Sequence, residues 1–180
     1  MQGELMTSLN WKLRDLYNLI CNSDDAYLRS LHEGPNWGND YRPLLENDRR
    51  ADPSGLVVQQ SLALWDEWEW TAQLHKFVAV DSREPFHTHQ ATVGFRYILL
   101  GGYDEEVIVG SGDSLRIELK QWRKGMCGFI HHNYNHRIIG IQPEGAMSLW
   151  IRGPTKHNVT WRYPSGAVRT LDIEGREIAI

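Results

Sequence analysis

The chain has 180 residues, a formal net charge of −4 and two cysteines. This length suits one domain with a short extension, and the mild acidity argues against a protein that binds nucleic acid through phosphate attraction. Two cysteines are too few for a disulfide framework, and no apolar run reaches the roughly 18 residues of a membrane span. We therefore expect a cytoplasmic protein with neither nucleic-acid nor membrane partners.

The first 55 residues are predicted to form a helical and looped extension. Apolar residues recur at helical spacing between residues 8 and 21, which is typical of an amphipathic helix. Ser23 or Asp24 could cap a second short helix that ends at Gly34. Residues 34–55 are rich in Gly, Pro, Asn and Asp. So long a connection either folds over a site or forms a surface excursion.

Residues 56–180 are predicted to form a mainly β domain. Short runs rich in Val, Ile, Trp, Phe and Tyr alternate with turn signals such as Gly101-Gly102 and residues 143–145. This pattern favours a sandwich or barrel over a parallel α/β sheet. The predicted strands cover residues 56–62, 69–80, 93–100, 105–109, 114–119, 128–131, 136–141, 147–151, 159–163 and 167–172.

Seven of the eight histidines lie between His75 and His157, and two of them form the H-x-H pair His87 and His89. On an extended strand, alternate residues share one face and lie about 6.5–7 Å apart. Two imidazoles on one face can bind the same metal ion. The run from His131 to His136 offers a third ligand from a later strand.

At these residues the sequence resembles the cupin superfamily, whose two motifs are G-x5-H-x-H-x(3,4)-E-x6-G and G-x5-P-x-G-x2-H-x3-N. His87 and His89 supply the first motif's histidines, and Gly101 stands at its closing glycine. Counted from Gly125, His136 falls on the ligand position of the second motif. The resemblance implies a cupin-type double-stranded β-helix, or jelly-roll barrel, with a helical extension. It also implies that His87, His89 and His136 bind a metal ion.

The sequence departs from the motif at Gly94, which stands where most cupins have a glutamate ligand. The result is a neutral three-histidine set, similar to that of cysteine-dioxygenase-like cupins. Fe(II) is the expected cofactor. Such a set also suits other metals, so Zn, Ni, Mn and Cu stay open. Glu105 or Glu106 could add a carboxylate ligand.

Four further residues are candidates for substrate binding. Arg96 shares the strand face of Gly94, where it either binds a substrate anion or pairs with an internal acid such as Glu118. Arg152 and Trp150 share a face of a later strand, and Tyr134 lies near the expected barrel mouth. No residue is assigned a catalytic role.

Two other residues are expected to be structural. Cys127 precedes a strand and is predicted to be buried and inert. His75 lies in an alternating strand and is predicted to be a satisfied core histidine or a hydrogen-bonded one.

The sequence therefore predicts a metal-dependent cupin that acts on a small anionic molecule, as a mononuclear non-heme iron dioxygenase-like enzyme. A non-catalytic small-molecule-binding or regulatory cupin, and a metal-dependent isomerase or epimerase, are the alternatives. A small molecule is the expected partner, and the resemblance also implies a homodimer, because open sheet edges need cover.

Overall fold

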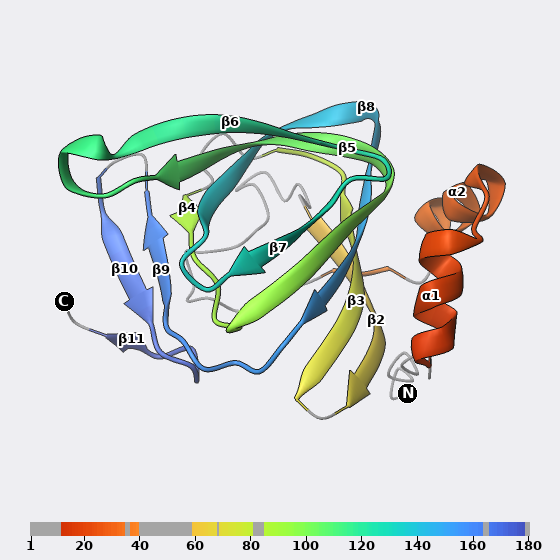
Figure 1. Cartoon of the computed structure of the whole chain (residues 1–180), viewed down its shortest axis with the longest axis horizontal. Helices are drawn as coiled ribbons and strands as arrows, with labels where there is room; N and C mark the ends of the chain where they lie inside the picture. Colours follow the sequence, from red (N-terminus) through yellow and green to blue (C-terminus); the bar gives the residue numbers. More distant parts are fainter. Residues whose placement is uncertain are drawn as a thin grey trace, which may run out of the picture.

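A computed structural model describes residues 12–34, 37–39, 59–67, 69–80, 85–163 and 166–178. Two short helices come first in the chain, and the strands that follow curl into a barrel beside them (Figure 1). The predicted fold class, a mainly β jelly-roll barrel with a helical extension, is confirmed. The predicted division at residue 55 and the long connection up to it fall almost entirely outside the described residues and stay predictions.

The two helices are α1 (Leu13–Cys21) and α2 (Asp25–Glu33). The Asp24 side chain accepts a hydrogen bond of 2.8 Å from the backbone N–H of Tyr27, which satisfies a free donor of the first turn of α2. Gly34 ends that helix as predicted. Among the described residues, neither helix is long and apolar enough to cross a membrane.

Among the described residues every strand pairing is antiparallel, and the strands form one continuous sheet. The order is β1-β2-β3-β8-β4-β9-β10-β11, while β5 pairs with β6, β7 and β8. The strands are β1 (Gly38–Asn39), β2 (Gln59–Glu67), β3 (Trp70–Phe77), β4 (Phe86–His87), β5 (Val93–Val109), β6 (Arg116–Arg123), β7 (Cys127–His131), β8 (Asn135–Arg152), β9 (Val159–Arg162), β10 (Val168–Leu171) and β11 (Glu177–Ile178).

Strands β5 and β8 are each longer than predicted. They pair from Gly94 opposite Arg152 to Ile108 opposite Asn135, with three register shifts on the way. The predicted breaks at Gly101-Gly102 and residues 143–145 are wrong, because both segments are bulges within continuous strands. Gly101 has a φ of +56°, a conformation that glycine adopts at bulges without steric cost.

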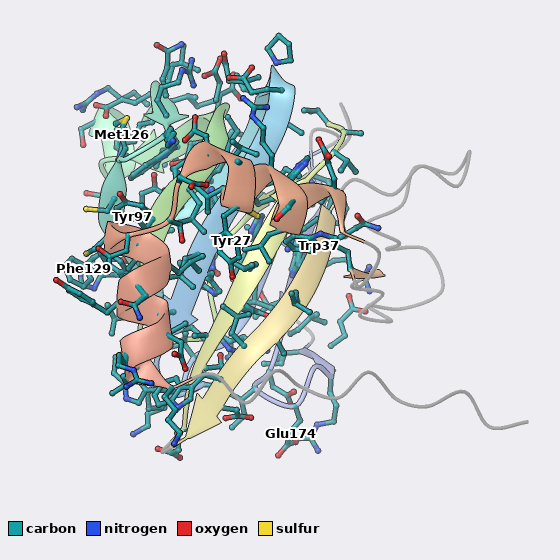
Figure 2. The ribbon with its side chains drawn as sticks, turned by 90° about the vertical axis from the view of Figure 1, so that its right-hand side faces the viewer. Tyr27, Trp37, Tyr97, Met126, Phe129 and Glu174 are labelled. Carbon is teal, nitrogen blue, oxygen red and sulfur yellow. The ribbon has the colours of Figure 1, made fainter. Side chains whose placement is uncertain are left out.

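The two faces of the sheet serve different purposes. In β3, Ala72 and Leu74 belong to an outer leucine-rich core, whereas Gln73, His75 and Phe77 line a cavity inside the barrel. Figure 2 shows the two helices across the outer face, in front of the strands drawn in yellow and blue. Leu16, Leu19 and Leu28 supply the helical half of the outer core.

Polar contacts also tie α2 to the barrel. The Lys76 ammonium donates a hydrogen bond of 2.6 Å to the carbonyl oxygen of His32 and lies 5.6 Å from the centroid of the Trp37 ring. Lys124 forms an ion pair with Asp25 at the other end of the helix. The helices therefore cover the sheet at defined positions.

We predict that Leu19→Ala lowers the free energy of unfolding by about 2–5 kcal/mol, because it opens a cavity between α1 and the sheet. Leu19 is 2% exposed, while Leu13 of the same helix is 58% exposed and provides the control. Leu13→Ala should change stability by no more than about 0.5 kcal/mol. Urea denaturation measures both variants, and equal effects would show that the helices do not stabilise the barrel.

Candidate metal centre

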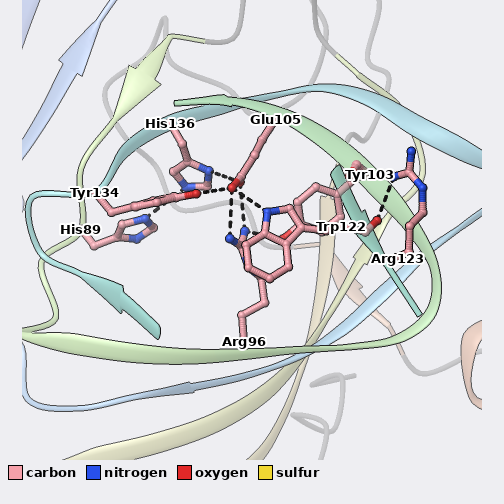
Figure 3. Close-up of polar contacts among 8 residues, drawn as sticks. All are labelled: His89, Arg96, Tyr103, Glu105, Trp122, Arg123, Tyr134 and His136. Atoms are coloured by element: carbon pink, nitrogen blue, oxygen red, sulfur yellow. Dashed lines mark hydrogen bonds and ion pairs between the residues drawn. The ribbon is translucent and has the colours of Figure 1, made fainter. Parts of the chain in front are cut away.

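His87, His89 and His136 converge inside the barrel although His136 is far from the other two in sequence. Their donor nitrogens all lie within 4.8 Å of one another. Nε2 of His89 and Nε2 of His136 are 3.1 Å apart (Figure 3). His87 lies on the two-residue strand β4, directly opposite His136 at the start of β8. His89 lies beyond the end of β4, a short strand that the sequence did not predict.

Backbone hydrogen bonds hold the segment that carries the H-x-H pair. The N–H of Thr88 donates to the carbonyl oxygen of Thr160, and the N–H of His89 donates to that of His132. The Trp161 indole stacks on the His87 ring with a centroid distance of 5.2 Å. The two histidines are therefore placed by neighbouring strands as well as by their own short strand.

The donor set fits a transition metal ion. Two nitrogens bound at about 2.0–2.2 Å to one ion lie no more than about 4.4 Å apart. The separation of 3.1 Å between His89 and His136 lies within that limit, and the outer bound of 4.8 Å for the cluster exceeds it only slightly. A small side-chain rotation is enough to bring all three nitrogens to one ion.

Glu105 lies behind His136 and is fully buried. Its Oε2 is 2.7 Å from Nδ1 of His136, and its Oε1 accepts hydrogen bonds from the Trp122 indole at 2.7 Å and from the Tyr134 hydroxyl. Burial by itself raises the pKa of Glu105, but the hydrogen bond from His136 and the charge of Arg96 hold that pKa well below its usual value. The carboxylate is therefore ionised.

Neither glutamate proposed as a fourth ligand belongs to the histidine cluster. Glu105 contacts the nitrogen of His136 that faces away from the other histidines. Glu106 forms an ion pair of 2.7 Å with Arg137 instead.

Arg96 is buried and pairs with Glu105. Its Nη1 and Nη2 donate to the two carboxylate oxygens at 3.0 and 3.1 Å, and Nη1 also donates to the Tyr103 hydroxyl at 2.5 Å. The guanidinium stacks on Trp122, 3.8 Å from the ring centroid. This is the internal-acid alternative, although the acid is Glu105, while Glu118 pairs with Arg116. A role for Arg96 in substrate binding stays a prediction.

The Trp150 side chain, from the neighbouring strand β8, packs directly against Gly94. A Cβ atom added at Gly94 would lie 2.1 Å from Cη2 of Trp150. The indole therefore fills the space that a glutamate side chain at this position would need. The same ring lies 5.7 Å from His89 and 6.2 Å from His75, measured between centroids.

The cluster opens into a cavity of about 470 Å³. Arg96, Trp150 and Arg152, three of the four predicted substrate-binding residues, line this cavity. Arg152 Nε donates to the Thr71 hydroxyl at 3.1 Å. Tyr134 is not among the lining residues, and its hydroxyl donates to Glu105. The binding roles of Arg152, Trp150 and Tyr134 are not decided by these positions and stay predictions.

Sequence reasoning missed several residues of the site. His75 faces the cavity rather than a closed core, and Glu105 and Trp122 were not assigned to the support of a histidine. Strand alternation in β3 is the signal that could have placed His75 beside Gln73 and Phe77 on the inner face. The prediction that Cys127 is buried is wrong, because this residue is exposed on β7.

No family model matches the chain, and no curated protein matches it in sequence. Among solved structures it is similar to KdgF from a Halomonas species, with 15% identity over 53% of this chain and 78% of that chain and a TM-score of 0.41. It is also similar to an RmlC-like cupin from Shewanella frigidimarina, with 17% identity, coverages of 58% and 81%, and a TM-score of 0.41.

A third similar structure is oxalate oxidase, with 11% identity over 57% of this chain and 54% of that chain and a TM-score of 0.46. The chain thus spans about half the length of oxalate oxidase. One of the three structures bears the name of the family that the two sequence motifs resemble.

We predict that Gly94→Ala lowers the free energy of unfolding by about 1–3 kcal/mol, because the added methyl group overlaps the Trp150 ring. Gly140→Ala is the matched control, because a Cβ atom there meets no atom closer than 3.6 Å. The control should remain within about 0.5 kcal/mol of the parent protein in urea denaturation. Equal stability of the two variants would contradict the assigned position of Trp150.

Proposed function

We propose that this protein is a mononuclear metal-dependent enzyme of the cupin type, with dioxygenase-like activity toward a small anionic molecule. The observation that carries the proposal is the cluster of His87, His89 and His136, which opens into a cavity of about 470 Å³. A cavity of this size suits a small-molecule ligand.

The charge of the centre supports an anionic substrate. Three neutral imidazoles leave the full charge of a divalent ion in place, and the carboxylate that contacts His136, that of Glu105, is paired with Arg96. An uncompensated positive charge in a partly closed cavity attracts an anion strongly, because the effective dielectric constant there is low. Anionic donors such as thiolates and carboxylates are therefore the expected partners.

Iron(II) is the metal proposed for these ligands, and when bound it supplies the redox chemistry that O2 activation requires. Three protein ligands leave positions open for a substrate and for O2. The same imidazole set also suits Zn, Ni and Cu, and Mn to a lesser degree.

The cavity walls supply both apolar cover and polar contacts. Phe77, Trp150 and Trp161 give the cavity an aromatic lining. Arg152 and Gln73 present polar groups on β8 and β3. We assign the orientation of the substrate anion to Arg152 and its apolar contacts to Trp150.

A metal-dependent isomerase or epimerase is the second candidate, and the position of His75 supports it. A histidine that lines the cavity can accept or donate a proton near neutral pH. The non-catalytic alternative, a small-molecule-binding or regulatory cupin, uses the same cavity without turnover. Oxygen uptake by the metal-loaded protein separates the oxidative reaction from both alternatives.

We predict that protein purified without added metal contains close to one equivalent of a transition metal, and that His87→Ala and His136→Ala each abolish most of it. Elemental analysis measures the metal content. His132→Ala is the control, because this exposed histidine stacks on His157 at 3.9 Å and lies outside the cluster. Equal metal content in all variants, or no metal binding by the parent protein, would contradict the proposed site.

We predict that Arg152→Met weakens the binding of malonate to the metal-loaded protein by about 10–100-fold, because a charge-assisted hydrogen bond contributes about 1.5–3 kcal/mol. Azide, which binds metal ions but has no carboxylate group for Arg152, should bind both proteins equally. Titration calorimetry provides both affinities. Malonate affinity that does not change would remove Arg152 from the substrate site.

A further inference from the structure

We propose that Glu105 is a positioning residue, which fixes the imidazole of His136 with its proton on Nδ1 and its lone pair on Nε2. This inference rests on the proposed metal site and identifies how one of its ligands is prepared before metal arrives.

The two nitrogens of His136 have different partners. Nδ1 is 2.7 Å from Oε2 of Glu105, whereas Nε2 is 3.1 Å from Nε2 of His89 and faces the cluster. Arg96 and Trp122 can only donate, and they donate to the two carboxylate oxygens of Glu105, which therefore act as acceptors. The hydrogen between His136 and Glu105 accordingly belongs to Nδ1. A neutral imidazole with hydrogen on Nδ1 keeps its free lone pair on Nε2, the atom directed at the other two histidines.

Glu105 cannot turn away from His136, because its two oxygens hold five contacts. Oε1 accepts from Arg96 at 3.1 Å, from Trp122 at 2.7 Å and from the Tyr134 hydroxyl. Oε2 accepts from Arg96 at 3.0 Å and from His136 at 2.7 Å. Two carboxylate oxygens offer about four lone-pair sites, so none is left for a metal ion. Figure 3 shows these donors arranged around the carboxylate.

Glu105 and the residues that donate to it come from different parts of the barrel. Arg96 and Glu105 lie in the two halves of β5, Trp122 lies on β6, and Tyr134 directly precedes β8. The orientation of His136 is therefore fixed by the closed sheet and not by its local sequence. A histidine ligand that donates its second N–H to a carboxylate binds metal more tightly, since its ring is oriented and more basic.

Arg96 completes this arrangement by balancing the charge of Glu105. The ion pair is almost fully buried, with side-chain exposures of 4% for Arg96 and 0% for Glu105. The pair contributes no net charge, so the support of His136 does not reduce the positive charge that a bound divalent ion would show to an anion. A glutamate ligand at position 94 would reduce that charge by one.

The wild-type protein provides the first test. Long-range 15N–1H correlation spectra of the metal-free protein, labelled on histidine and recorded at neutral pH, distinguish the two tautomers of each ring. We expect the His136 ring to carry its proton on Nδ1. A proton on Nε2 would overturn the proposal without any effect on the proposed function.

Metal titration provides the second test, with Co(II) as the probe and its visible absorption as the readout. We expect Glu105→Gln to bind Co(II) about 10–100-fold more weakly than the parent protein and to change the absorption spectrum. Glu106→Gln is the matched control, because the neighbouring carboxylate pairs with Arg137 outside the cluster. Unchanged affinity in a folded Glu105→Gln variant would overturn the proposal.

Glu105→Gln also leaves Arg96 without its counter-charge, so this variant can fail to fold. Tyr134→Phe then serves in its place, because it removes one donor to the carboxylate and changes no charge. We expect a smaller loss of Co(II) affinity in the same direction, and unchanged affinity would count against the proposal. Failure of the parent protein to bind Co(II) would instead contradict the proposed metal site.

Discussion

Arg96 and Glu105 face each other inside the barrel with almost no exposure to water, and the candidate site is arranged around this ion pair. Removal of two charges from water costs several kcal/mol per ion, and mutual attraction offsets that cost only when the remaining donors and acceptors are also satisfied. Trp122 and Tyr134 donate to the carboxylate and Tyr103 accepts from the guanidinium, which leaves Nε of Arg96 as a buried donor without a partner among the described residues. The pair thus requires β5, β6 and the start of β8 to meet in one register, which is the register that brings His136 to the H-x-H segment.

The polar inner face of the sheet explains why the outer face must be covered by an apolar core. The inner face carries histidines, arginines and glutamines around a cavity, so it provides only part of an apolar core. The outer face of β3 and β8 compensates with Leu74, Met147 and Leu149, which pack beneath α1 and α2. The helical extension therefore completes the apolar core, a structural role that does not depend on the site.

The carboxylate of the site stands at another sequence position, and makes another contact, than the glutamate of the motif that the sequence resembles. The motif position is Gly94, and the Trp150 indole fills the space above it. The acid is instead Glu105, which contacts the far side of a histidine in the cluster rather than the cluster itself. Because Arg96 neutralises it, the histidines remain a neutral donor set.

The sequence by itself determined the local elements and the candidate ligands. Helical spacing predicted α1, and a cap at Ser23 or Asp24 predicted α2. Alternation and turn signals predicted most strands, and motif spacing selected His87, His89 and His136 from eight histidines. Each of these features depends on residues close together in the chain or on a spacing that can be counted.

Only the tertiary structure decided what lies behind the histidines. The bulges near Gly101 move the buried face of β5 from Arg96 and Ile98 to Tyr103 and Glu105, so alternation counted along the sequence fails to place the carboxylate inside. The partners of Glu105 come from three separate strands or their ends, and no local pattern joins them. Burial depends on how the sheet closes, which is a property of pairings distant in sequence.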